Sequence, residues 1–332
     1  MSHPFPDLTQ GPLSLGQYMK LCAERYYNTH PAIGPTGDFV TSPEISSLFG
    51  EMLGLWGVHV WQSLGAPPTL QIVELGPGRG TLLKDMLAIF QRFCNASLSL
   101  HLLETSAALE ALQRDALGSA PAHWHRSMET LGAALEGPAL FFANEFFDAL
   151  PMEQYVYHQD AWHQRMVDQS PAGLFFFLKP TSPQKAPGHE GEIREVNEDA
   201  QRIFSKMLEI LEAQGGGFLI ADYGYKEGRG DTLQALWNRG PISPLAKPGE
   251  SDITAHVDFG ALTALLSPSF QWTLTTQKDF LEQLGFWTRV QQLLPHVEDA
   301  QRLEQAAHRL THPQAMGHLF QVLTGLHPGM PR

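Results

Sequence analysis

The segment IVELGPGRGT, residues 72–81, decides the fold that this sequence predicts. An apolar strand pattern runs into three glycines, Gly76, Gly78 and Gly80, and a helix pattern begins at Thr81. Glycine allows a tight turn and a close approach of a ligand to the backbone, and the first turn of a helix offers free N–H groups. The segment therefore predicts a ligand-binding turn between a strand and a helix of an α/β domain.

The spacing of the glycines favours one nucleoside ligand over another. A dinucleotide fingerprint requires G-x-G-x-x-G, whereas Gly76, Gly78 and Gly80 form G-x-G-x-G. Glu74, two residues before the first glycine, can attract the cationic sulfonium and ammonium groups of S-adenosylmethionine. Glu104 ends the next strand pattern and can accept the ribose hydroxyls, although a solvent-exposed acid is the alternative. The pattern predicts S-adenosyl-L-methionine as the cofactor and disfavours a nicotinamide-dependent oxidoreductase.

Strand and helix patterns alternate on both sides of this turn. We expect strands at residues 70–75, 99–104, 122–125, 139–144 and 217–222. Helices are expected at residues 81–93 and 107–116, and further ones near 258–266 and 277–284. This order predicts an α/β fold with a doubly wound, mainly parallel sheet that a C-terminal segment rejoins.

The N-terminal segment, residues 1–66, has helical patterns that stand outside this alternation. One helix is expected within residues 11–27, with Ser14 as its N-cap. A long helix is expected from Thr41 to about Leu64, because Thr41 and Glu44 have the spacing of a capping box around Pro43. We expect this segment to contribute to the functional site.

Residues 151–214 interrupt the alternation with short aromatic runs typical of antiparallel strands, at 154–158, 161–167 and 174–178. We interpret residues 151–214 as an inserted substrate-recognition subdomain that covers the carboxyl edge of the sheet. The cofactor-binding domain is then expected to comprise residues 67–150 and 215–332.

Polar residues follow the fourth strand in the segment FFANEFFDALP, residues 141–151. Asn144, Glu145 and Asp148 should face the ligand, because ligands of open α/β sheets lie at the carboxyl ends of the strands. Carboxylates there can hold a guanidinium group by charge-assisted hydrogen bonds and orient one nitrogen toward a donated methyl group. We expect all three to be catalytic, and the alternative for Asn144 or Asp148 is to cap a helix or turn.

The segment GDFVTSP, residues 37–43, is a candidate for the opposite wall of the same site. Asp38 and Glu44 add carboxylates, and we expect Glu44 to act beside the catalytic residues. Thr41 and Ser42 add hydroxyl groups that we expect to contact the cofactor, with simple capping as the alternative for Thr41. A third group can line the cleft, and it consists of DYGY at residues 222–225 with Asp252, His256 and Asp258.

Composition and charge exclude several classes of protein. Of 332 residues, 43% are hydrophobic and 17% are charged, which supports a folded core. A formal net charge of −13 argues against a nucleic-acid partner. Two cysteines make neither a disulfide framework nor a zinc site, and His123 and His125 lack an evident further ligand, so no metal is expected. Without an apolar run of membrane-spanning length or a targeting peptide at residues 1–10, we expect a cytoplasmic bacterial protein.

Several long motifs in one order resemble the MidA family, which includes the mitochondrial complex I assembly methyltransferase. They are GDFVTSPEISSLFGEMLGLW, VELGPGRGTLL, ANEFFDALP, IADYGY and GESDITAHVDF, within a resemblance that runs from about Gly11 to Leu323. The resemblance implies a class I S-adenosylmethionine-dependent methyltransferase. For the mitochondrial members it also implies methylation of a protein arginine.

The chain departs from the family at two places. Ala107 and Glu110 stand where the family pattern E-x-S-P-x-L-R has Pro and Arg, and residues 25–27 read RYY where the family has G-Y-Y. These changes leave the donor site intact and bear on the identity of the substrate.

The resemblance and the acidic residues together predict an enzyme that methylates an arginine of a partner protein, with a respiratory complex I subunit under assembly as the candidate. Two alternatives stay open: a methyltransferase for another N or O acceptor, and a non-catalytic assembly factor that uses the nucleoside site for stability. The chain is also a candidate homodimer. A mature mitochondrial matrix protein is the alternative to a cytoplasmic one.

Overall fold

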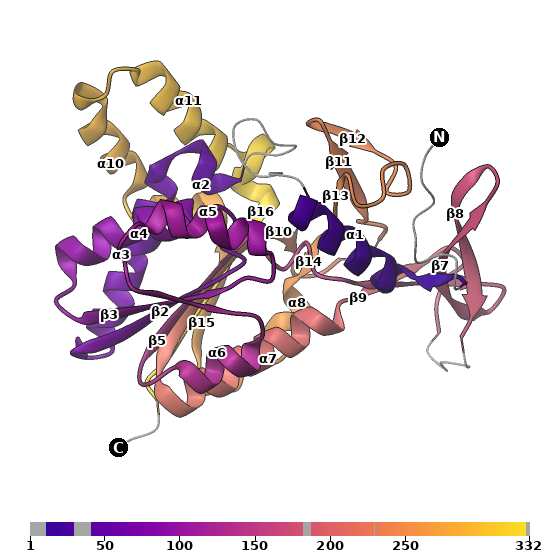
Figure 1. The fold of residues 1–332 in the computed structure, drawn as a ribbon, viewed down its shortest axis with the longest axis horizontal. Helices are drawn as coiled ribbons and strands as arrows, with labels where there is room; N and C mark the ends of the chain where they lie inside the picture. Colours follow the sequence, from indigo (N-terminus) through magenta and orange to yellow (C-terminus); the bar gives the residue numbers. More distant parts are fainter. Residues whose placement is uncertain (1–10, 30–40, 182–186, 229, 330–332) are drawn as a thin grey trace.

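An eight-stranded β-sheet forms the centre of the protein in a computed structural model, which describes residues 11–29, 41–181, 187–228 and 230–329 (Figure 1). The strands follow the order β4 (Ala122–His125), β3 (Ser97–Leu103), β2 (Thr69–Leu75), β5 (Ala139–Asn144), β10 (Gly216–Tyr225), β16 (Phe320–His327) and β15 (Gln271–Thr276). A short strand, β14 (Val257–Asp258), pairs with the end of β10. Neighbours from β4 to β10 are parallel, and β16 is antiparallel to β10 and β15.

The strand order confirms the predicted doubly wound sheet and the return of the C-terminal segment to it. From β2 the chain steps outward to β3 and β4, and it then returns to place β5 on the other side of β2. The order of the strands thus reverses between β2 and β5. In open α/β sheets the ligand lies at such a reversal, beyond the carboxyl ends of the strands.

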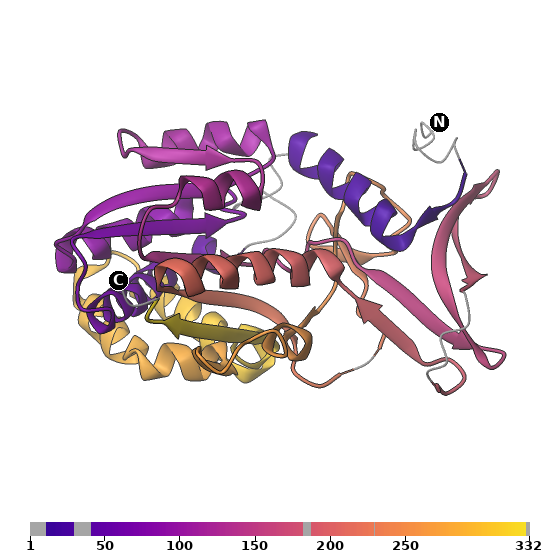
Figure 2. The ribbon, with the colours of Figure 1, turned by 90° about the horizontal axis from the view of Figure 1, so that it is seen from below.

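Helices cover both faces of the sheet because its strands are apolar on both faces. Along β5, Leu140 and Phe142 pack with α3 (Ser47–Ser63) and α4 (Thr81–Phe93). Phe141 and Ala143 point the other way and pack with α6 (Met128–Ala134), α7 (Glu198–Gln214) and α8 (Phe259–Thr263). Figure 2 shows α7 lying along the sheet. The remaining helices are α5 (Ala107–Leu117), α9 (Gln277–Gln283), α10 (Phe286–Leu293), α11 (Ala300–Thr311) and the short turns η2 (Leu294–His296) and η3 (Pro313–Gly317).

A second unit contains the predicted antiparallel strands. It is built from β6 (Glu153–His158), β7 (Ala161–Ser170), β8 (Gly173–Pro180), β9 (Ile193–Val196) and the N-terminal β1 (Leu13–Ser14). Helix α1 (Leu15–Thr29) packs on this unit through Leu15, Tyr18 and Met19. Figures 1 and 2 place the unit beyond the carboxyl edge of the large sheet. Since α7 packs on the large sheet, we propose that the inserted subdomain ends before α7.

A three-stranded antiparallel sheet, which the sequence did not predict, lies beside α1. Its strands are β11 (Gln234–Trp237), β12 (Gly240–Ile242) and β13 (Asp252–Thr254). Within the described residues, no helix combines the length and the apolarity that crossing a membrane requires.

The N-terminal helices differ in part from the expectation. Ser14 caps α1 as predicted, because its Oγ accepts a hydrogen bond from Gln17 N at 3.2 Å. The prediction of a single long helix from Thr41 is wrong. A short helix, α2 (Ser42–Ile45), ends at Ser46, whose extended backbone separates it from α3. The Ser46 side chain then caps α3 by accepting from Leu48 N. The prediction of a capping box is wrong as well, because the Thr41 side chain makes no capping hydrogen bond within the described residues.

Candidate functional site

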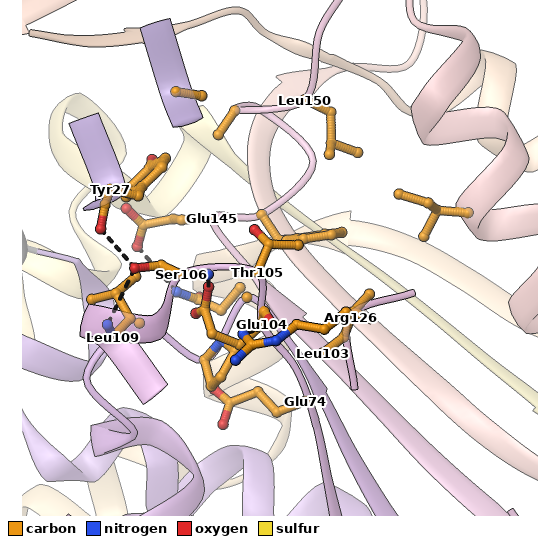
Figure 3. A pocket seen from close by; sticks show the side chains of 18 of the residues that line it. Tyr27, Glu74, Leu103, Glu104, Thr105, Ser106, Leu109, Arg126, Glu145 and Leu150 are labelled. Carbon is orange, nitrogen blue, oxygen red and sulfur yellow. Dashed lines mark hydrogen bonds between the residues drawn. The ribbon is translucent and has the colours of Figure 1, made fainter. Parts of the chain in front are cut away.

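A cavity of about 720 Å³ lies at the carboxyl ends of β2, β3 and β5, where the strand order reverses. The glycine turn after β2 forms its floor, and the end of α1 and the start of α2 and α7 complete its walls. Figure 3 shows Glu74, Glu104 and Glu145 around it, each from a different strand end. The predicted site residues in its lining are Thr41, Glu44, Glu74, Gly76, Gly78, Glu104, Asn144 and Glu145.

The glycine turn needs glycine for its backbone conformation and for space. Gly76, Gly78 and Gly80 have φ of +61°, +52° and +82°, in the region that side chains disfavour. A Cβ at Gly76 would lie 2.5 Å from Cδ2 of Phe146. Gly80 lies outside the cavity lining and is the N-cap of α4, where a Cβ would approach Gln113 Cα to 3.3 Å. The turn is thus packed against its neighbours and open on the cavity side.

Glu74 brings a buried carboxyl group to this floor. The side chain is 3% exposed, and its Oε2 has no hydrogen-bond partner among the described residues. Burial raises the pKa of Glu74 to about 8, opposed by a backbone hydrogen bond from Leu83 and aided by the charge of Glu104. An unpartnered buried carboxyl is costly without a positive partner, so this position suits a cationic group of a ligand.

Glu104 stands at the next strand end and is held by α5. Its Oε1 accepts from Ser106 N at 2.7 Å and its Oε2 from Gln113 Nε2 at 3.0 Å. Burial raises the pKa of Glu104, and these hydrogen bonds and the Arg126 charge oppose the shift. Each carboxylate oxygen has a second lone pair, so the group can still accept hydroxyl hydrogen bonds from a ligand.

Asn144 and Glu145 form the part of the cavity wall at the end of β5. Glu145 Oε1 accepts hydrogen bonds from Ser42 N at 2.9 Å and from Asn144 Nδ2 at 3.2 Å. Oδ1 of Asn144 is buried and has no partner in the described part of the chain. Burial raises the pKa of Glu145 to about 7, the Ser42 hydrogen bond lowers it and the charge of Asp148 raises it. The wall therefore presents a carboxyl group that titrates near neutral pH.

The structure separates four further acids from the cavity. Asp148 is buried outside the lining, beside Tyr223, whose hydroxyl donates a hydrogen bond to it. Asp222 is fully buried behind the same turn. Asp252 accepts from the Tyr27 hydroxyl at 3.2 Å, and Asp258 caps α8. The expectation that these four acids face the ligand directly therefore differs from their observed places.

The segment at the start of α2 contributes to the site, but not through all of the side chains that the sequence predicted. Glu44 lines the cavity and accepts from Thr81 Oγ1 at 2.6 Å, which ties α2 to α4. Thr41 lines the cavity, whereas Ser42 is buried and meets Glu145 through its backbone N–H. Asp38, the other acid proposed for this wall, lies outside the described residues.

Several lining residues were not found from the sequence. Tyr27 reaches the cavity from α1, and its carbonyl accepts from Ser106 Oγ at 2.8 Å (Figure 3). Arg126 follows β4, donates to the carbonyl of Glu104 at 2.6 Å and pairs with Glu110. The rim farther from the glycine turn is lined by Lys20, Glu24, Leu150, Asp199, Arg202 and Ile203.

His101 of β3 and His125 of β4 belong to a buried chain of hydrogen bonds. His101 Nδ1 lies 3.0 Å from His125 Nε2, and His101 Nε2 lies 2.9 Å from Gln71 Oε1. Burial, and then the charges of His125 and His123, lower the pKa of His101 to about 4. No three His, Cys, Asp or Glu side chains of the described ranges gather in a way that could hold a metal ion.

Comparisons with known proteins agree with this geometry. Residues 52–276 match the model of a family described as "Putative S-adenosyl-L-methionine-dependent methyltransferase". The chain is 34% identical to the mitochondrial protein arginine methyltransferase NDUFAF7 of Rattus norvegicus, over 94% of this chain and 81% of that protein. The protein of the same name from Homo sapiens is 32% identical, over 93% of this chain and 79% of that protein.

A solved structure has the same fold. A protein from Burkholderia thailandensis, crystallised with S-adenosyl-homocysteine, superposes with a TM-score of 0.79 and 22% identity, over 96% of this chain and 89% of that one. This likeness confirms the predicted fold class, and the sequence matches confirm the resemblance found from the motifs.

Proposed function

The chain belongs to this family of S-adenosyl-L-methionine-dependent methyltransferases, and from that premise we propose that it methylates an arginine side chain of a partner protein. The enzyme class and the cofactor follow from the family. The arginine acceptor is supported by the names of the relatives and by the acids of the cavity.

The residues of the cavity fit S-adenosylmethionine. The positive-φ glycine turn leaves its backbone accessible, and the unpartnered carboxyl of Glu74 suits a cationic group. Glu104 retains lone pairs for hydroxyl groups. When bound, the donor supplies a methyl group that is attached to a sulfonium. The sulfur part of the donor is a good leaving group. The chain therefore has to align the acceptor more than it has to activate it.

Glu145 is the observation that carries the arginine proposal. Its carboxyl lies in the cavity wall, half-buried, with Oε1 fixed by Ser42 and Asn144. A guanidinium offers a carboxylate two parallel hydrogen bonds and a full positive charge, which offsets the cost of burying the carboxylate. A lysine ammonium cannot make this planar two-point contact, and both acceptors release one proton on methylation. Glu145 would thus hold the guanidinium and orient one nitrogen.

The partner is proposed to be a respiratory complex I subunit that binds this protein while the complex is being assembled. The acceptor chain is expected to enter between the segment of residues 37–43 and the inserted subdomain. Glu24 is an exposed acid of the cavity lining, whereas Asp199 is already paired with Arg202. The curated relatives are named as mitochondrial proteins. A cytoplasmic bacterial enzyme, a homodimer and the absence of a nucleic-acid partner stay predictions of the sequence.

A transfer assay tests the proposed function. The protein is mixed with radiolabelled S-adenosylmethionine and an extract of cells that lack its gene, and the labelled proteins are hydrolysed to amino acids. We expect label in methylated arginine that depends on the added protein. Label in another amino acid or in small molecules would replace arginine as the acceptor, and no label would favour the non-catalytic assembly factor.

Glu74 gives a prediction for binding of the donor. Because its pKa is about 8, the carboxyl is mostly protonated at pH 7, and a cationic ligand that pairs with it should expel the proton. Calorimetry of S-adenosylmethionine binding at pH 7, in two buffers of different ionisation enthalpy, should show proton release in the wild type. Glu74→Gln should lose most of this release and bind more weakly. Equal release in both proteins would show that Glu74 does not meet the cationic groups.

A further inference from the structure

The turn after β5 holds Glu145 in a backbone conformation that a glutamate seldom adopts. Its φ is +50°, in the left-handed region where a Cβ is unfavourable. Residues outside glycine keep such a conformation only when their surroundings over-determine it. The surroundings of this turn therefore identify what fixes the carboxylate of Glu145 in the cavity wall.

Asp222, at the end of β10, supplies most of that restraint. Its Oδ2 accepts hydrogen bonds from the backbone N–H groups of three successive residues, Phe146 at 3.2 Å, Phe147 at 3.0 Å and Asp148 at 3.3 Å. Its Oδ1 accepts from Tyr223 N at 3.0 Å. Only a carboxylate can accept at both of its ends, so no other side chain of this size satisfies all four donors.

Neighbouring residues of β10 complete the hold on the turn. Glu145 N donates to the carbonyl of Ala221 at 3.0 Å. The hydroxyl of Tyr223 donates to the carboxylate of Asp148, and the Tyr223 ring packs on His256 and Phe320. The end of β10 thus fixes both acidic residues of the turn, although only Glu145 faces the cavity.

We infer that Asp222 is a positioning residue for methyl transfer, which holds the strained turn and thereby aims the Glu145 carboxylate at the acceptor. This inference rests on the proposed role of Glu145. Asp222 itself touches no ligand, since it is 0% exposed and lies outside the cavity lining. An amide in its place would turn an NH₂ group toward backbone donors, and the turn would relax toward an unstrained φ.

Burial and charge show that Asp222 is not an ordinary structural acid. Burial, and then the carboxylates of Asp148 and Glu145, raise its pKa well above the usual value, and the hydrogen bonds of the turn oppose this. Three acids packed this closely would be unfavourable if they served stability alone. This cost in stability has a reason if the turn has to hold the carboxylate of Glu145 at a fixed position in the cavity wall.

The first test compares Asp222→Asn with Asp258→Asn. Asp258 caps α8 by accepting from Ala261 N at 2.9 Å, and asparagine is an equally good cap, so this control should transfer methyl at the wild-type rate. Asp222→Asn should lower transfer to extract proteins about 100-fold, as expected for displacement of an orienting group by about 1 Å. Its affinity for S-adenosyl-homocysteine, measured by calorimetry, should stay close to that of the wild type.

A second test separates positioning from a general loss of structure. The destabilisation by Asp222→Asn is measured in two backgrounds that both lack the charge of Glu145, namely Glu145→Gln and Glu145→Gly. Glutamine keeps the strained φ, so relaxation of the turn recovers part of the cost of losing Asp222, whereas glycine has no strain to release. The destabilisation should therefore be larger in the glycine background than in the glutamine background. This cycle needs no acceptor, so it reports on the turn even if the wild type proves not to methylate arginine.

If Asp222→Asn does not fold, Tyr223→Phe takes its place. This change removes only the hydroxyl that holds Asp148. It should lower transfer by a smaller factor than displacement of the whole turn, with unchanged donor affinity. Wild-type transfer in the folded Asp222→Asn, or in Tyr223→Phe when that variant is the one tested, would overturn the inference. Equal destabilisation in the glutamine and glycine backgrounds would overturn it as well.

Discussion

Glu145→Gln is expected to lower methyl transfer at least about 100-fold while leaving the affinity for the donor unchanged. Glutamine has nearly the shape of glutamate, so its Oε1 can still accept from Ser42 N. It has lost the negative charge that pairs with a guanidinium in a buried site, where an unmatched charge is most costly. The loss should therefore appear in the rate of transfer and not in binding of the donor, for which we propose Glu74 and Glu104 as the anchors.

Initial rates with radiolabelled donor and calorimetry with S-adenosyl-homocysteine measure the two effects separately. Glu209→Gln is a suitable control, because Glu209 is an exposed acid of α7 that pairs only with Lys206 in the described structure. Transfer by Glu145→Gln at the rate of the wild type would remove Glu145 from the acceptor site.

The pKa of Glu145 adds a pH dependence to this result. Burial raises its pKa to about 7, so the carboxyl is neutral below this pH and charged above it. If the charged form holds the guanidinium, transfer by the wild type should rise as the pH passes upward through about 7. The residual rate of Glu145→Gln should lack this rise.

Gly76→Ala should abolish detectable binding of the donor. The new Cβ would lie 2.5 Å from the Phe146 ring, so either the ring moves into the cavity or the turn opens. Alanine at a φ of +61° is also strained, at a cost of about 1 kcal/mol. Strain alone lowers stability without closing the site, so the two effects have to be separated.

Gly65→Ala is the matched control for that strain. Gly65 has φ of +82° and no neighbouring atom within 4 Å of a Cβ, and it follows α3 away from the cavity. Gly65→Ala should lose only the small unfolding free energy of the strained φ in denaturant titrations, and Gly76→Ala should lose more because of the Phe146 contact. Only Gly76→Ala should lose binding in calorimetry. Donor binding by a folded Gly76→Ala would show that the turn is not the donor floor.

The parts of the fold that depend on local pattern were predictable. Strands β4 and β5 and helix α4 have the bounds expected from their apolar spacing, and the glycine turn lies where its motif placed it. The break at Ser46 was missed because TSPEISSLFG also has the pattern of one continuous helix. Its only local sign was a second serine able to cap a helix.

The sequence could predict only those site residues whose position depends on the end of a single strand. Glu74 is the last residue but one of its strand, Glu104 and Glu145 directly follow theirs, and all three line the cavity. Asp148 follows only three residues after Glu145, and its turn away from the cavity depends on Asp222 and Tyr223 of a distant strand. Tyr27 likewise enters through a hydrogen bond from Ser106, which no local pattern reveals.

Quantitative mass spectrometry of cells with and without this gene tests the central claim most directly. We predict that methylation disappears from one or a few arginines of a partner protein when the gene is deleted, and that it returns with the wild-type gene but not with Glu145→Gln. Loss confined to lysines, glutamines or small metabolites, with every arginine unchanged, would contradict the arginine acceptor while leaving the methyltransferase family assignment in place.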